Sequence, residues 1–195
     1  RATTDWIFQT PEFKQWLHQD QPVLWLSGKI GSGKSVATSS VIQFIQRLKP
    51  SSGSPLAFFF VQAGETDSNT ATTILKSILQ QMVESSKMTT RIEDALQSLH
   101  PSSDAEDILE VLREMAPTRE FYIIVDGIDE CDGTHTVELL KALSALASCR
   151  PSLRLFLSGR PSLHSDINRY FTEFTLLSME SPNVNADIAT YITDA

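Results

Sequence analysis

The sequence has few cysteines, no long apolar run and no excess of basic residues, and each absence narrows its function. Two cysteines in 195 residues, Cys131 and Cys149, do not make a disulfide framework, which favours a reducing compartment such as the cytosol. No apolar stretch approaches the roughly 18 residues that span a bilayer, and residues 1–5 do not resemble a secretory signal. We therefore expect a cytoplasmic chain with no membrane partner.

Acidic residues outnumber basic ones by 24 to 16, which gives a formal net charge of −8. Because the basic residues are scattered, we do not expect the broad positive surface that binds a nucleic-acid backbone. A hydrophobic content of 41% indicates a globular domain, and 195 residues suffice for one sizeable core. The chain does not begin with Met, so we expect it to be a piece of a longer protein.

The strongest signal is the run GKIGSGKS at residues 28–35, which matches the P-loop (Walker A) motif: a Gly, any four residues, then Gly-Lys-Ser. The apolar residues 23–26 before it predict a buried strand, and helical spacing begins at Val36. Glycines allow the N–H groups of such a turn to converge on a phosphate, and the positive end of the following helix favours an anion there. The motif therefore predicts a nucleoside-triphosphate site.

The residue types of the loop suggest individual roles. We expect Lys34 to contact the β- and γ-phosphates and the Ser35 hydroxyl to coordinate Mg²⁺. Gly28, Gly31 and Gly33 are expected to adopt backbone angles that are closed to other residues. The residues predicted to bind the nucleotide are Gly28, Lys29, Ile30, Gly31, Ser32, Gly33, Lys34, Ser35 and Val36.

Strand-like and helix-like segments alternate along the rest of the chain, which predicts an α/β fold with a parallel sheet and helices on both faces. Strands are expected at residues 23–26, 56–61, 121–125, 153–157 and 174–177. Helices are expected from residue 10, over 36–48, from 70, from 92, over 104–115 and over 136–147. The continuous apolarity of residues 56–61 favours a strand covered on both faces.

Polar residues that follow two of these strands extend the site. Asp126 ends the run YIIVD in a Walker B pattern, and we expect it to hold Mg²⁺ opposite Ser35. Many P-loop ATPases carry a catalytic acid directly after this Asp, where this chain has Gly127, so the role would move to Asp129 or Glu130 or be absent. Arg160 follows another strand, and its planar guanidinium suits a γ-phosphate.

Three motifs in order resemble the NACHT nucleotide-binding domain of the STAND P-loop NTPases: residues 28–35, residues 123–130 (IIVDGIDE) and residues 157–161 (LSGRP). A small residue after the Walker B Asp, with acids just downstream, is that family's departure from ordinary ATPases. The lead-in residues 5–8 (DWIF) look most like fungal NOD-like receptors. The closing residues 187–192 are similar to the helix at which such domains begin to leave their sheet.

The resemblance implies a three-layer α/β/α P-loop NTPase with a mainly parallel five-stranded sheet, in which the Arg160 strand separates the P-loop strand from the Walker B strand. Residues 1–20 would form a lead-in segment with a short helix, and residues 21–195 the NACHT-like domain. Trp6, Ile7 and Phe8 would either line the nucleotide base or pack in the core.

The resemblance also implies a function. Such a domain is a slow, Mg²⁺-dependent switch that binds ATP/ADP or GTP/GDP, and we prefer ATP. Its triphosphate form favours self-association of an intracellular receptor of the innate-immunity type. The effector and repeat domains that flank it in the family would lie outside this chain.

Two alternatives stay open at this stage. The first is a phosphotransferase of the P-loop kinase group, which would need an acceptor pocket and usually an Arg-rich lid. The second is a scaffold that binds the nucleotide and never hydrolyses it. Phosphate release would separate the switch from the scaffold, and a kinase would require a second substrate.

Overall fold

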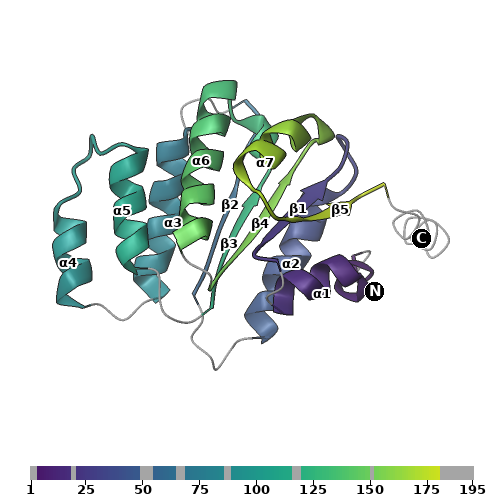
Figure 1. Ribbon diagram of the computed structural model, residues 1–195, viewed down its shortest axis with the longest axis horizontal. Coiled ribbons are helices and arrows are strands. Elements are labelled where there is room, and N and C mark those ends of the chain that lie inside the picture. Colours follow the sequence, from purple (N-terminus) through teal and green to yellow (C-terminus); the bar gives the residue numbers. More distant parts are fainter. Residues whose placement is uncertain are drawn as a thin grey trace.

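The computed structural model of the protein describes residues 4–18, 21–48, 55–64, 69–85, 89–115, 120–149 and 152–180. Its centre is a parallel five-stranded sheet in the order β2-β3-β4-β1-β5 (Figure 1). The strands are β1 (Val23–Ser27), β2 (Leu56–Phe60), β3 (Phe121–Asp126), β4 (Leu153–Gly159) and β5 (Thr175–Ser178). The five expected strands are all present, and β4 separates the P-loop strand β1 from the Walker B strand β3.

Helices cover both faces of this sheet (Figure 1). Those of the described ranges are α1 (Pro11–His18), α2 (Lys34–Leu48), α3 (Ala71–Ser85), α4 (Thr90–Gln97), α5 (Ala105–Met115), α6 (Gly133–Cys149) and α7 (His164–Tyr170). Helices α1 and α2 pack on one face, whereas α3, α6 and α7 pack on the other, with α5 and α4 beyond α3. This is the three-layer α/β/α arrangement of a P-loop NTPase.

Alternation along the central strands explains the two apolar layers. In β1, Val23 and Trp25 belong to the cluster under α3 and α6, whereas Leu24 and Leu26 belong to the cluster under α1 and α2. Successive side chains of a strand point to opposite faces, so a strand covered on both faces must be apolar throughout. All five residues of β1 are accordingly buried.

Strand β2 is an edge strand in which only Ala57 is fully buried. Ala57 and Phe59 pack in the cluster under α3 and α6, and Phe58 and Phe60 pack against the cluster under α1 and α2, so both faces of β2 are covered, but incompletely. Two details of the other expected elements were wrong. Helix α2 begins at Lys34, inside the P-loop motif and not after it. Helix α7 was not expected, because its seven residues bury only Ile167 and give no helical period.

The lead-in segment packs directly on the sheet. Phe13 and Trp16 of α1 are buried in the same cluster as Ile7, and Trp16 Nε1 donates to Leu155 O of β4 at 3.1 Å. Thr10 caps this helix by accepting a hydrogen bond from Phe13 N. A division of the chain at residue 20 stays a prediction, and residues 187–192 lie outside the described part. No helix in the described ranges is long and apolar enough to cross a bilayer.

Candidate nucleotide-binding site

The turn between β1 and α2 has the backbone geometry of a phosphate-binding loop. Gly31 and Gly33 have φ angles of 74° and 87°, which disfavour every residue with a Cβ. Gly28 is required for a different reason from the one expected: a Cβ there would lie 2.5 Å from Ser32 Oγ and 2.8 Å from Met179 Cβ. The first glycine therefore allows close packing against the end of β5, while the other two allow the turn.

Lys34 stands at the start of α2 with its ammonium group above the loop. Its Nζ donates to Gly28 O at 2.7 Å and to Lys29 O at 2.9 Å. The first turn of α2 contains no acidic residue to neutralise the positive end of the helix. The lysine and the helix end together make this turn a favourable place for an anion.

Asp126 ends β3 and lies beside the loop. Ser35 Oγ donates to its Oδ2 at 2.6 Å, although the two residues are 91 positions apart. Asp126 is 3% exposed and also accepts hydrogen bonds from the Thr38 and Ser158 hydroxyl groups. A serine hydroxyl and a carboxylate are the oxygen donors that Mg²⁺ takes next to substrate phosphates, so Ser35 and Asp126 fit this ion.

Gly127 turns the chain immediately after Asp126. Its φ is 75°, and a Cβ on it would lie 3.2 Å from Val61 O. An acidic side chain at this position would therefore strain the backbone and crowd Val61, the residue that follows β2. The turn leads into the short 3₁₀ helix Ile128–Glu130, which carries the two downstream acids.

Those acids form ion pairs with Arg160, which follows β4. Arg160 Nε lies 2.7 Å from Asp129 Oδ2, and Arg160 Nη2 lies 2.8 Å from Glu130 Oε1. The backbone N–H of Arg160 also donates to Asp129 Oδ1 at 3.1 Å. Asp129 is the more enclosed acid, with 7% of its side chain exposed against 29% for Glu130. Burial raises the pKa of Asp129, and the Arg160 charge opposes that rise.

These groups meet in one hollow of about 380 Å³. Its lining joins the loop to the ends of β3 and β4, and consists of residues 30–36 with Val61, Ala63, Asp126, Gly127, Asp129, Glu130 and Arg160. Seven of the nine residues predicted to bind the nucleotide line it. Gly28 and Lys29 are not part of this lining, and their carbonyl oxygens accept hydrogen bonds from Lys34.

A family model described as the N-terminal part of nephrocystin 3 matches residues 2–160. The chain belongs to this family. A curated relative, vegetative incompatibility protein HET-E-1 of Podospora anserina, is 25% identical over 165 residues, which are 80% of this chain and 12% of that protein. These two matches confirm the expected resemblance to the NACHT-like domains of STAND NTPases.

Solved structures with the same fold support the P-loop NTPase assignment of this member of the family. A Walker-type ATPase of Pyrococcus abyssi matches 98% of the chain and 58% of its own, with 13% identity and a TM-score of 0.56. The ORC1 protein of Aeropyrum pernix, solved in complex with DNA, matches 94% of the chain and 47% of its own, with 15% identity and a TM-score of 0.58. At these identities the likeness shows the fold alone.

The aromatic residues of the lead-in segment pack in the core. Trp6 and Ile7 belong to the cluster under α1 and α2, and Phe8 stacks on Phe44 of α2 at 4.6 Å between ring centroids. Among the described residues, the lining of the hollow includes none of these three. The contacts therefore favour core packing over a role in reading the base.

Sequence reasoning missed Thr38 and Ser158, whose hydroxyl groups bind Asp126. Thr38 lies one helical turn after Lys34, a spacing that places it on the same side of α2. Ser158 could be found only from the sheet order, because it lies on β4 and its hydroxyl group contacts the end of the adjacent strand β3. Both are completely buried.

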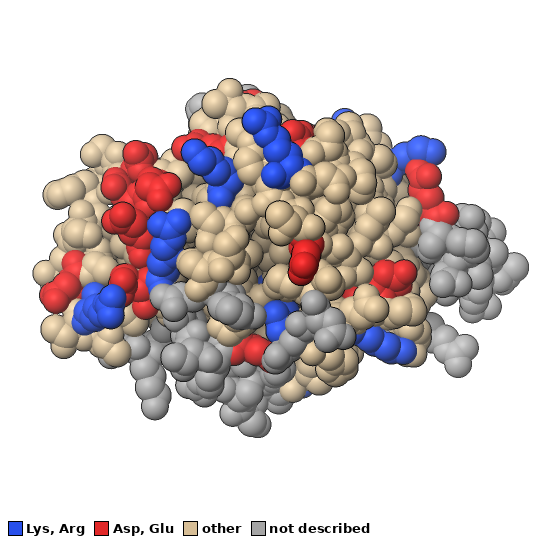
Figure 2. Space-filling model, in the orientation of Figure 1, with Lys and Arg blue, Asp and Glu red and all other residues tan. Residues whose placement is uncertain are grey.

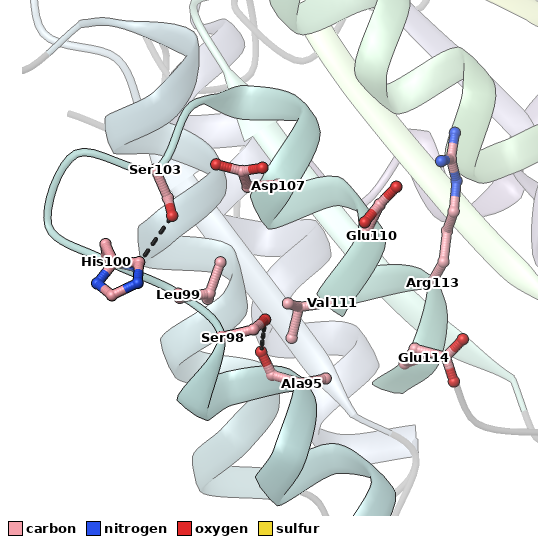
Figure 3. A pocket seen from close by; sticks show the side chains of 10 residues that line it. All are labelled: Ala95, Ser98, Leu99, His100, Ser103, Asp107, Glu110, Val111, Arg113 and Glu114. Atoms are coloured by element: carbon pink, nitrogen blue, oxygen red, sulfur yellow. Dashed lines mark hydrogen bonds between the residues drawn. The ribbon is translucent and has the colours of Figure 1, made fainter.

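The described residues also form a hollow that lies apart from this site. This larger hollow of about 640 Å³ opens between α4 and α5, where Asp107, Glu110 and Glu114 line it with Arg113 (Figure 3). It shares no residue with the phosphate-binding hollow, so its size does not make it the nucleotide site. On the face drawn in Figure 2, Lys and Arg side chains stand singly or in small groups among the acids.

Proposed function

We propose that this domain is a Mg²⁺-dependent nucleoside-triphosphate switch that controls self-association of a larger intracellular receptor. The observation that carries the proposal is the meeting of the P-loop, Ser35, Asp126 and Arg160 in one hollow. The chain spans about 12% of the curated relative that it matches, so the receptor and its signalling output belong to the proposal.

The residues of the chain suggest how a triphosphate would be held. The loop N–H groups and the start of α2 would bind the β-phosphate, and Lys34 would exchange its two carbonyl partners for phosphate oxygens. Ser35 and Asp126 would hold the Mg²⁺, which when bound neutralises charge on the β- and γ-phosphates. We take ATP as the nucleotide and GTP as the alternative.

Arg160 would distinguish the triphosphate from the diphosphate. A γ-phosphate would compete with Asp129 and Glu130 for the guanidinium, since all three are anions that suit its planar donors. Hydrolysis would be slow for as long as an acid stays paired with Arg160 in this competition, because a paired acid is less free to orient an attacking water.

The same ion pairs favour one alternative function, a scaffold that binds nucleotide without hydrolysing it. In that case Asp129 and Glu130 would serve to hold Arg160 and would never act on water. Phosphate release by the parent protein separates the two: a switch releases phosphate slowly but continuously, and a scaffold releases none.

The test of the proposal is a titration of ATP and GTP with and without Mg²⁺, with light scattering to follow self-association. We expect Mg²⁺-dependent triphosphate binding that Lys34→Ala abolishes or greatly weakens, because the variant loses its charge-assisted phosphate contact. Lys141→Ala, which changes an exposed lysine of α6, is the matched control. Equal affinity in the parent and in Lys34→Ala would refute the site.

A further inference from the structure

The Asp126 carboxylate accepts hydrogen bonds from hydroxyl groups of two different elements. From α2, Ser35 Oγ donates to Oδ2 at 2.6 Å and Thr38 Oγ1 donates to Oδ1 at 2.7 Å. From β4, Ser158 Oγ also donates to Oδ1. Thr38 and Ser158 are completely buried, whereas Ser35 is exposed at the hollow. One carboxylate oxygen is therefore bound from the protein interior, and the other lies beside Ser35.

The surrounding donors fix the direction of these bonds. Gly127 N–H donates to Ser158 Oγ at 3.1 Å, so the hydroxyl hydrogen of Ser158 is left for Asp126. The Thr38 hydroxyl has one hydrogen and two acceptors within reach, Lys34 O at 2.9 Å and Asp126 Oδ1 at 2.7 Å. The carboxylate is the nearer acceptor and carries the charge, so it is the stronger partner.

We propose that Thr38 and Ser158 are positioning residues for the metal site: they hold Asp126 Oδ1 so that Oδ2 and Ser35 Oγ face the Mg²⁺ of the bound nucleotide. The inference rests on the proposed function of Mg²⁺–nucleotide binding. Thr38 lies outside the three sequence motifs, and Ser158 lies within residues 157–161 but had no role assigned to it.

The physical reason is the freedom of a carboxylate. The terminal torsion of an Asp side chain is broad, so an unsupported carboxylate samples many orientations. Two buried hydrogen bonds to one oxygen select a single orientation before the ion arrives, and the ion then needs less reorganisation to bind. Partners that orient a metal ligand in this way are typically worth about 10- to 100-fold in metal affinity.

The experiment measures the Mg²⁺ concentration that gives half-maximal binding of a non-hydrolysable triphosphate, followed by calorimetry. Thr38→Val preserves the shape of the side chain and removes the hydroxyl group. We expect it to raise the half-saturating Mg²⁺ concentration about tenfold or more, while triphosphate affinity measured in excess chelator stays at the parent value. Thr38→Ser restores the hydroxyl group and is expected to return most of the Mg²⁺ affinity.

Ser39→Ala is the matched control for the loss of a helical side-chain bond. Ser39 Oγ donates to Ser35 O at 2.7 Å, much as Thr38 Oγ1 reaches Lys34 O, but Ser39 makes no hydrogen bond with Asp126 among the described residues. Its Mg²⁺ dependence is expected to match the parent. Ser158→Ala is a second test from a different strand, and thermal unfolding without Mg²⁺ verifies that each variant is folded.

The outcomes separate this inference from the proposed function. Parent-like Mg²⁺ dependence in both Thr38→Val and Ser158→Ala would overturn the positioning role while leaving the nucleotide site intact. An equal loss of affinity with and without Mg²⁺ would also overturn it, because that pattern indicates a general distortion of the loop. If the parent itself shows no Mg²⁺-dependent binding, the proposed function fails and the inference fails with it.

Discussion

Arg160 and Asp129 are joined twice: Arg160 Nε lies 2.7 Å from Asp129 Oδ2, and the Arg160 backbone N–H donates to Asp129 Oδ1 at 3.1 Å. The carboxylate thus holds both the side chain and the main chain of the arginine at the end of β4. Glu130 contacts only the guanidinium in this arrangement, and its side chain is four times as exposed, 29% against 7%. The two acids are therefore not equivalent: Asp129 holds Arg160 in place, and Glu130 is the more accessible to solvent.

Glu130→Gln is expected to slow phosphate release by about 100-fold or more, the range of a lost general base, while triphosphate binding persists. Asp129→Asn is expected to slow phosphate release less than Glu130→Gln does. Its main effect is expected on triphosphate binding, because both Asp129 oxygens contact Arg160. Single-turnover phosphate release and equilibrium binding measure the two effects. Asp132→Asn is the control, since Asn also caps a helix and Asp132 Oδ1 accepts from His135 N. Parental turnover in both site variants would show that neither acid orients the water.

Arg160→Ala is expected to narrow the affinity gap between triphosphate and diphosphate by about tenfold or more, since a hydrogen bond to a charged group contributes roughly 1.5–3 kcal/mol. The diphosphate lacks the group that would compete with Asp129 and Glu130, so its affinity should change little. Parallel calorimetric titrations of the two nucleotides give the ratio. Arg169→Ala on α7, an exposed arginine outside the hollow, is the control. An unaltered ratio in Arg160→Ala would remove the sensor role.

Gly159→Ala is expected to destabilise the fold by about 1–3 kcal/mol, the usual cost of overpacking a core. A Cβ at this position would lie 2.6 Å from Trp25 Cη2 and 3.0 Å from Asp129 Oδ1. Chemical denaturation gives the free energy of unfolding. Gly133→Ala serves for comparison because a Cβ there has no described neighbour within 4 Å, and it should leave stability nearly unchanged. Equal stability of the two variants would contradict this prediction, because it would show that the Trp25 ring can move away from the added Cβ without a measurable cost in free energy.

Cys131 is expected to react slowly with a thiol reagent at pH 8, whereas Cys149 reacts promptly. Burial, with the charges of Asp132 and Asp129, raises the pKa of Cys131 to about 11, so roughly 0.1% of it would be the reactive thiolate at that pH. The reactive fraction should grow about tenfold for each pH unit up to that pKa. Cys149 is exposed. Absorbance assays should count one fast thiol in the native parent and none in Cys149→Ser; two fast thiols in the native parent would contradict the burial of Cys131.

Local patterns made several parts of the site predictable. The P-loop could be recognised because its glycines, Lys34 and Ser35 act within eight consecutive residues, and the strand before it is apolar on both faces. Asp126 could be placed near the nucleotide because it ends a strand, and ligands collect at the carboxyl ends of the strands in a parallel sheet. The edge position of β2 could not be read in this way, because residues 56–60 are apolar although four of the five are only partly buried.

What the sequence by itself determined is the chemistry of the nucleotide site: a turn that can bind phosphate, a lysine, a hydroxyl group and an acid after a buried strand. What only the tertiary structure decided is which groups meet. Insertion of β4 between β3 and β1 brings Ser158 to Asp126 and Arg160 to Asp129, pairs that are 32 and 31 residues apart along the chain. Hydrogen bonds and ion pairs act over a few ångströms, so strand order sets these contacts. The family resemblance implied that order, but no local pattern in the sequence shows which side chains it brings into contact.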